Sequence, residues 1–137
     1  MADCALAFPA TFEAYAHASA ELRAAIDRRA LQPGPRYKVE LVFEEIVSNI
    51  IRHGCVDNTG CTIELSIGFG DGSIVLEFQD NGRAFDPRDY AVSDVPLTLE
   101  DARHGGLGLL LVRKASAGID YERTAGDLNR LTVTIAV

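Results

Sequence analysis

Three polar side chains, Glu45, Asn49 and His53, recur at four-residue spacing within an otherwise apolar segment. In a helix, each step of four residues drifts by only about 40°, so the three would share one stripe. An amide oxygen suits a hard cation such as Mg²⁺, and a carboxylate one turn away can orient or deprotonate a nucleophile. The solvated face of an ordinary amphipathic helix would show the same stripe. The spacing alone leaves both interpretations open.

A second polar cluster follows a run of alternating apolar residues. Asp80 comes directly after this predicted strand, and Gly82 follows two residues later. A carboxylate held at a strand end can accept hydrogen bonds from an amino group, such as that of an adenine ring. A glycine beside it lets a ring approach the backbone closely. The alternative interpretation is an Asn-Gly turn with a solubilising aspartate.

A third cluster, residues 104–108, combines glycines with the start of a leucine-rich helix. Free N–H groups and the positive end of a helix dipole together form an anion site. No Gly-Lys-Ser/Thr follows, which excludes a Walker A loop. The glycines follow an irregular segment instead of a strand, which also fits the Rossmann fingerprint poorly. The alternative is a hinge that precedes a packing helix.

Hydrophobic periodicity predicts the elements that must position these clusters. Strict alternation in 62–69 and 73–79 predicts one buried and one polar sheet face, with a hairpin turn at Gly70-Asp71-Gly72. Residues 81–104 show no sustained period. The expected fold is an α+β two-layer sandwich: a mostly antiparallel mixed sheet covered on one face by about three helices, in a single domain, 1–137. The expected helices run from Thr11 to about 31, over 35–53 and over 106–117, and the expected strands are 4–8, 62–69, 73–79, 119–123 and 131–137.

Composition narrows the classes of protein. A chain of 137 residues with 47% hydrophobic content can build one real core. Its net charge of −7 argues against direct nucleic-acid binding and anionic membranes. No signal-peptide pattern or long apolar run occurs, so we expect a cytoplasmic protein without a membrane span. Cys4, Cys55 and Cys61 are an odd number without a Cys-x-x-Cys motif, which favours free thiols and shows no metal-ligand spacing.

The clusters together, in this order, resemble a known superfamily. A Glu-x-x-x-Asn helix, a strand ending in Asp-x-Gly, an irregular segment and a Gly-x-Gly helix start are similar to those of the GHKL ATPases. These ATPases share the Bergerat ATP-binding fold of gyrase, the histidine kinases and MutL-type proteins. Within the superfamily, the chain resembles the small bacterial anti-sigma factor serine kinases over about residues 5–137. The resemblance implies ATP and Mg²⁺ as cofactors and an ATP lid at about 81–104.

The resemblance also implies a role for each matching residue. Glu45 matches the catalytic carboxylate, Asn49 the Mg²⁺-binding amide, and His53 a position near the phosphates or ribose. Asp80 matches the aspartate that reads adenine, with Gly82 beside the base. The other matches are Phe85 where the lid opens, Arg103 as a lid cation, and Gly106, Leu107 and Gly108 in the phosphate-binding glycine motif.

Two features depart from the family pattern. Ala84 stands where many relatives carry a second glycine, which puts the shape of the base pocket in question. Many relatives also place a threonine near the adenine on a late strand. Thr132 and Thr134 lie opposite the apolar face of the last predicted strand, so neither takes that role.

The resemblance implies an anti-sigma factor with serine/threonine protein kinase activity. Such a protein sequesters a sigma factor and phosphorylates a STAS-domain anti-anti-sigma factor, and a homodimer is a further family expectation. An ATP-gated binding module without kinase activity is the main alternative. Glu45 argues for chemistry, because a pure binder does not need that carboxylate. A third interpretation is an interaction protein that binds no nucleotide.

Overall fold

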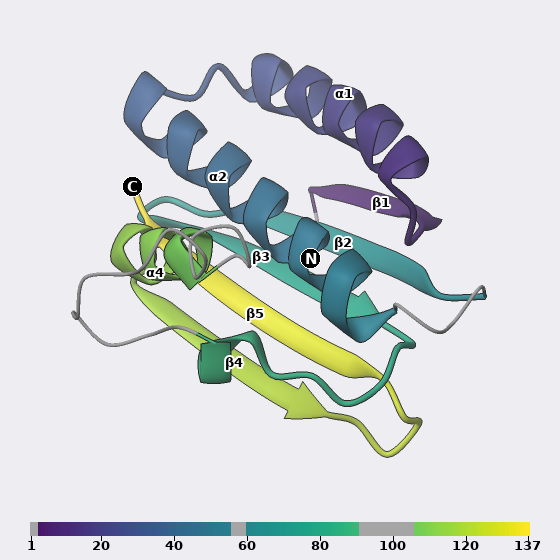
Figure 1. Cartoon of the computed structure of the whole chain (residues 1–137). Coiled ribbons are helices and arrows are strands. Elements are labelled where there is room, and N and C mark those ends of the chain that lie inside the picture. Colours follow the sequence, from purple (N-terminus) through teal and green to yellow (C-terminus); the bar gives the residue numbers. More distant parts are fainter. Residues whose placement is uncertain (1–2, 56–59, 91–105) are drawn as a thin grey trace.

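A computed structural model of the chain describes residues 3–55, 60–90 and 106–137. In these residues, strands and helices follow one another in the predicted order (Figure 1). The bounds lie within a few residues of the predicted ones. The strands are β1 (Cys4–Pro9), β2 (Thr62–Phe69), β3 (Ser73–Asp80), β4 (Gly118–Arg123) and β5 (Asn129–Ala136), and the α-helices are α1 (Phe12–Arg29), α2 (Pro33–Asn49) and α4 (Gly106–Ala115).

The five strands form one sheet in the order β1-β2-β3-β5-β4. Every strand pair in the described part of the chain is antiparallel, so the parallel pairing implied by a mixed sheet is not seen there. The Gly70 N–H donates to the Ser73 carbonyl at 2.8 Å, which closes the predicted hairpin turn. The helices lie on one side of the sheet, with α2 between α1 and α4 (Figure 1). The predicted two-layer α+β sandwich is therefore confirmed.

Alternation along β2, β3 and β5 sends one set of side chains into the core beneath the helices. Burying these side chains drives the two layers together, since removal of apolar surface from water is the main favourable contribution to folding. The inward-facing residues are Ile63, Leu65 and Ile67 from β2, Ile74, Leu76 and Phe78 from β3, and Leu131, Val133 and Ile135 from β5.

Helix α1 begins as predicted, because the Thr11 hydroxyl accepts a hydrogen bond from the Ala14 N–H at 3.1 Å. It ends at Ala30, which adopts a left-handed conformation with φ of 52°. The Phe12 side chain, in the first turn of α1, is 49% exposed. The Arg52 guanidinium lies over the Phe12 ring, 5.7 Å from its centre, so this ring contacts a cation at the surface.

Helix α2 starts at Pro33, two residues earlier than predicted, because proline is well suited to the first turn of a helix. It does not remain α-helical to His53. A π-helical turn, η1 (Ile50–Gly54), follows Asn49, and the Cys55 N–H donates to the Ile50 carbonyl at 2.9 Å. Such wide turns often occur at functional sites.

The expectation of free thiols is wrong for two of the three cysteines. Cys55 and Cys61 form a disulfide with a Cα–Cα distance of 5.8 Å, whereas Cys4 is free. Cys55 directly follows the end of η1 and Cys61 directly precedes the start of β2, six positions later, and their Cα–Cα distance lies within disulfide range. An odd cysteine count does not reveal this pairing, because it depends on where the helix ends and where the strand begins.

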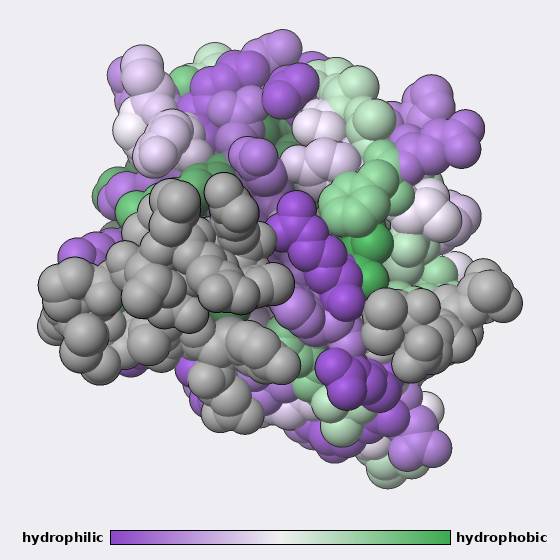
Figure 2. Space-filling model, viewed as in Figure 1, coloured by the Kyte–Doolittle hydropathy of each residue, from purple (hydrophilic) through white to green (hydrophobic). Residues whose placement is uncertain are grey.

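Figure 2, drawn from the same side as Figure 1, shows hydrophilic residues gathered over the C-terminal half of α2. In α2, Glu44 is exposed and Glu45 is half-buried, and in η1, Arg52 is exposed and His53 is half-buried. The predicted polar stripe therefore includes half-buried and fully buried side chains, since Asn49 is only 1% exposed. None of the described helices is long and apolar enough to cross a membrane.

Candidate functional site

The three sequence clusters meet where α2 and η1 end, where β3 ends and where α4 begins. A Cβ atom on Gly108 of α4 would meet the Glu45 carboxylate of α2. A Cβ atom on Gly82 would lie 2.4 Å from the Gly54 carbonyl oxygen, and one on Gly54 would lie 3.8 Å from an Asp80 carboxylate oxygen. Residues far apart in the sequence thus line one region.

Glu45 packs against the first turn of α4. A Cβ atom on Gly108 would lie 1.8 Å from Glu45 Oε2, so any other residue at this position would require the carboxylate to move. Burial raises the pKa of Glu45 and the nearby charge of Glu44 raises it further, whereas Arg52 opposes both effects. A carboxylate that is more basic than usual suits the acceptance of a proton from a hydroxyl group.

Asn49 lies one turn further along α2 and is only 1% exposed. Its Nδ2 donates to the Glu45 carbonyl at 2.6 Å, which fixes the orientation of the amide. Its Oδ1 is buried and accepts no hydrogen bond from the described residues. A buried acceptor without a partner is costly, so the arrangement indicates a ligand that supplies the missing contact. A hard cation such as Mg²⁺ fits this oxygen.

Asp80 is the last residue of β3, one position further into the strand than predicted, and it is 5% exposed. One carboxylate oxygen accepts hydrogen bonds from the Gly82 N–H at 2.9 Å and from Asn129 Nδ2 at 3.0 Å. Burial raises the pKa of Asp80, and those hydrogen bonds and the charge of Arg123 oppose the rise. A buried, preoriented carboxylate of this kind can accept a hydrogen bond from an amino group of a base.

Asn129, the first residue of β5, is a site residue that the sequence analysis missed. It pairs directly with Asp80 in the sheet and is 3% exposed. Its Nδ2 also donates to the Arg83 carbonyl at 2.7 Å, while its Oδ1 accepts from the Phe85 N–H at 3.3 Å. The Tyr121 hydroxyl donates to the same oxygen. Asn129 therefore holds both Asp80 and the segment that follows it.

The segment after Asp80 is fixed against the end of η1. The Arg83 N–H donates to the Gly54 carbonyl at 3.0 Å, and Arg83 Nε donates to the His53 carbonyl at 2.6 Å. The His53 ring meets the buried Phe85 ring edge-on, with ring centres 5.5 Å apart. His53 and Phe85, which come from different clusters, thus lie together on the Asp80 side of the site.

The glycine cluster is described in part. Gly106 is the first residue of α4, so the free N–H groups of this helix begin where predicted. Leu107 lies in the first turn of α4. Arg103 and most of the predicted lid lie outside the described residues. The part of the lid that is described, 81–90, ends in a 3₁₀ turn, η2 (Pro87–Tyr90).

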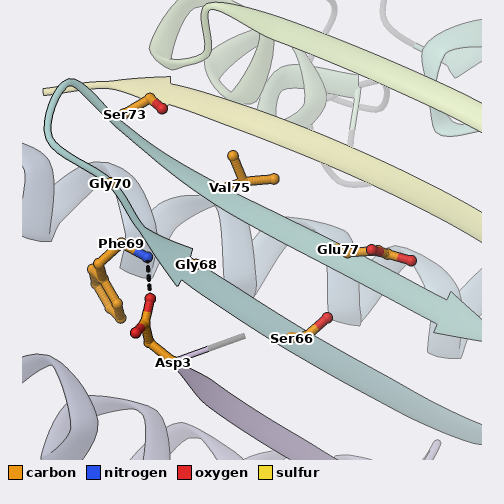
Figure 3. A pocket seen from close by; sticks show the side chains of 8 residues that line it. All are labelled: Asp3, Ser66, Gly68, Phe69, Gly70, Ser73, Val75 and Glu77. Atoms are coloured by element: carbon orange, nitrogen blue, oxygen red, sulfur yellow. Dashed lines mark hydrogen bonds between the residues drawn. The ribbon is translucent and has the colours of Figure 1, made fainter. Parts of the chain in front are cut away.

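A separate hollow of about 390 Å³ lies on the open face of the sheet (Figure 3). The Phe69 N–H donates to an Asp3 carboxylate oxygen there at 2.7 Å, and Asp3 also pairs with Arg29. The lining does not include the residues of the three clusters, so this hollow is not the predicted site. Its lining residues are Asp3, Ser66, Gly68, Phe69, Gly70, Ser73, Val75 and Glu77.

Comparison with known proteins places this chain in a family. The model of the histidine kinase-like ATPase domain matches residues 8–135. The chain therefore belongs to the histidine kinase-like ATPase domain family, whose fold is an ATP-binding fold. The predicted resemblance to the GHKL ATPases is confirmed.

One relative by sequence is the serine/threonine-protein kinase BtrW of Bordetella bronchiseptica. It is 31% identical over 99 residues, which are 72% of this chain and 69% of BtrW. Among solved structures, the SiaB–SiaC complex of Pseudomonas aeruginosa matches with a TM-score of 0.67 at 15% identity, over 99% of this chain and 91% of that one. The RsbU and RsbW domains of a Mycobacterium tuberculosis protein match with a TM-score of 0.63 at 16% identity, over 98% of this chain and 33% of that one. At these identities the two structures show the shared fold.

Proposed function

We propose that this chain is an ATP- and Mg²⁺-dependent serine/threonine protein kinase that also acts as an anti-sigma factor. The observation that carries the kinase proposal is the Glu45 carboxylate packed against Gly108, one turn from the unpartnered Oδ1 of Asn49. This arrangement sets a basic carboxylate and a cation ligand beside the start of a helix. The similarity to BtrW supports serine and threonine as acceptors.

Each residue takes a role that its surroundings allow. Bound ATP supplies the phosphoryl group, and bound Mg²⁺ neutralises phosphate charge. Asn49 would hold the cation through Oδ1, and the first N–H groups of α4 would bind phosphate oxygens. Glu45 would orient the attacking hydroxyl group and accept its proton, and Asp80 would accept a hydrogen bond from the adenine amino group. Lining roles would fall to His53, Gly82, Phe85 and Leu107, and a phosphate-binding role to Arg103.

The proposed regulatory effect of this chain depends on its binding to partner proteins. We infer that the chain phosphorylates a STAS-domain anti-anti-sigma factor and holds a sigma factor, in the cytoplasm and as a homodimer. The net charge of −7 supports a basic, DNA-binding protein as partner, since complementary charge steers association. The same charge argues against direct nucleic-acid binding.

The test is phosphate transfer from radiolabelled ATP to a purified STAS-domain protein. We expect transfer by the native protein and a loss of about 10²- to 10⁴-fold in Glu45→Gln, because the proton acceptor is removed. Glu44→Gln is the matched control: this exposed neighbour on the same helix should keep full transfer at neutral pH. Full transfer by Glu45→Gln would refute the proposed catalytic role.

Nucleotide binding is measured separately to distinguish the alternatives. ATP-Mg²⁺ at about 100 times its dissociation constant should stabilise the protein by ~2.7 kcal/mol in thermal unfolding. Stabilisation without transfer to the STAS-domain protein would favour an ATP-gated binding module. The absence of stabilisation would favour an interaction protein that binds no nucleotide.

A further inference from the structure

The Cys55–Cys61 disulfide lies beside the side chain that is proposed to read the base. Both sulfur atoms and an Asp80 carboxylate oxygen lie within 4.8 Å of one another. The two cysteines are 7% and 4% exposed, so they are packed into this part of the fold. Breaking the bond therefore changes the immediate surroundings of Asp80.

The residues next to the two cysteines hold the turn after Asp80 from both sides. Gly54, which precedes Cys55, accepts a hydrogen bond from the Arg83 N–H at 3.0 Å. Thr62, which follows Cys61, donates its N–H to Asn81 Oδ1 at 2.7 Å. The disulfide thus joins the two backbone segments between which residues 80–83 are held.

We propose that Cys55 and Cys61 form a reversible redox modification site that controls nucleotide affinity, and this rests on the nucleotide site proposed above. The disulfide keeps the end of η1 and the start of β2 together, so the turn at 80–83 keeps its geometry before a nucleotide arrives. A preformed site binds more tightly because less order must be created on binding. Reduction releases the link and lowers the affinity.

The modification is an ordinary exchange of thiols. A thiolate of a dithiol reductant attacks one sulfur of the pair, forms a mixed disulfide and releases the other cysteine. The second thiol of the reductant then closes its own disulfide and releases the remaining cysteine. Two electrons pass to the protein. Re-oxidation by hydrogen peroxide converts the two thiols into the disulfide and the peroxide into two waters. Disulfides in reducing compartments are mostly transient and redox-sensing, which suits a cytoplasmic signalling protein.

The first experiment compares two redox forms of one protein. In a Cys4→Ser variant, Cys55 and Cys61 are the remaining cysteines. Calorimetric titration with ADP, which avoids turnover, should show an affinity at least about fivefold weaker after reduction with dithiothreitol, the lower end of typical coupling between two sites. Adding Cys55→Ser and Cys61→Ser should give the weaker affinity with or without reductant.

The second experiment needs no change at the disulfide. The Cys4→Ser protein is equilibrated with mixtures of reduced and oxidised dithiothreitol, with and without ADP, and its thiols are counted by alkylation and mass spectrometry. Because coupling is reciprocal, ADP should favour the disulfide by the same factor by which the disulfide favours ADP.

The outcomes separate the two proposals. Equal ADP binding after reduction, with no effect of ADP on the thiol–disulfide equilibrium, would overturn the redox proposal and leave the nucleotide site standing. Tighter ADP binding after reduction, with ADP favouring the thiols, would overturn it as well. Absence of ADP binding in both forms would overturn the nucleotide site itself, and the redox proposal with it. If the variant with Cys55→Ser and Cys61→Ser does not fold, the effect of ADP on the thiol–disulfide equilibrium of the Cys4→Ser protein still tests the redox proposal.

Discussion

The candidate site has two ends, one at Asp80 and one at Asn49. They differ in whether the polar groups form hydrogen bonds with other residues of the chain. Around Asp80, the polar groups pair with one another: Asn129 and Gly82 donate to one carboxylate oxygen, and Asn129 also holds the backbone of Arg83 and Phe85. Around Asn49, a buried amide oxygen has no hydrogen-bond partner in the described part of the chain, and a carboxylate of raised pKa lies one turn away.

This difference separates a part of the site whose geometry is fixed by the chain from a part that retains an unsatisfied polar group. The Asp80 end is built on two paired strands, so its geometry exists before any ligand binds. The proposed function has the Asn49 end completed by the cation that it binds. Four predictions test this contrast, from the largest expected effect to the smallest.

Asn129→Ala should have the largest effect, because it removes several buried hydrogen bonds at once. The Phe85 N–H and the Arg83 carbonyl would lose their partner, and Asp80 would lose a donor. We expect a loss of about 3 kcal/mol in the free energy of unfolding, measured with urea. Asn81→Ala, which removes an exposed amide, should cost about 1 kcal/mol, since water can replace its contacts. Equal losses of unfolding free energy in Asn129→Ala and Asn81→Ala would contradict the proposal that the buried hydrogen bonds of Asn129 stabilise the Asp80 end.

Asp80→Asn should lower nucleotide affinity without lowering stability. The adenine amino group would lose a charged acceptor, worth about 2 kcal/mol or roughly thirtyfold in affinity by calorimetry. Because the folded state raises the pKa of Asp80, native stability falls as pH rises from the ordinary value of 3.8 through the raised pKa. The variant lacks this fall, so above that window it should match or exceed the native protein. Asp71→Asn, in the exposed hairpin turn, should change neither quantity.

Gly108→Ala should reduce phosphate transfer while leaving the fold intact. The new Cβ atom would meet the flexible end of Glu45, which must move, and a misplaced catalytic group can cost up to about a hundredfold in rate. Stability should change by less than about 1 kcal/mol, because alanine favours a helix over glycine by a similar amount. Gly34→Ala, with open space around its Cβ position, should leave transfer unchanged. Normal phosphate transfer by Gly108→Ala would contradict the proposal that transfer depends on the position of Glu45.

The pH dependence of transfer should show the smallest change. Glu45 must be ionised to accept a proton, so transfer should be lost as pH falls through a midpoint above the ordinary 4.5. Glu44→Gln should lower this midpoint, because the charge of Glu44 contributes to the raised pKa. Rate profiles of kcat/KM against pH would measure both midpoints. An unchanged midpoint would show that Glu45 does not set the profile.

The sequence predicted the elements well because their signals are local. Alternation in β2 and β3, and the spacing of Glu45 and Asn49, are properties of short windows, so periodicity and motif order led to the fold and to most of the site. Asn129 was missed because one polar residue at the start of a strand has no periodic signal. Its role comes from pairing with Asp80 across the sheet, 49 positions away in the chain.

The cysteines and the end of α2 also show that local sequence patterns do not predict features that depend on the three-dimensional path of the chain. Helical spacing to His53 predicted a regular helix, whereas the last turn widens at Ile50–Gly54. The partner of Cys55 depends on where that turn ends. Its pairing with Cys61 is therefore a property of the three-dimensional path of the chain, which cysteine counting does not capture.

The wide turn η1 also determines the directions in which the side chains after it point. An α-helix rotates by about 100° per residue, so a turn that holds one extra residue delays the next side chains by that angle. Deleting one residue from η1 would restore α-helical winding and turn His53, Gly54 and Cys55 away from their present directions. The Gly54 carbonyl would leave Arg83, and Cys55 would leave Cys61. The extra residue in η1 thus determines that the Gly54 carbonyl points toward Arg83 and that Cys55 points toward Cys61.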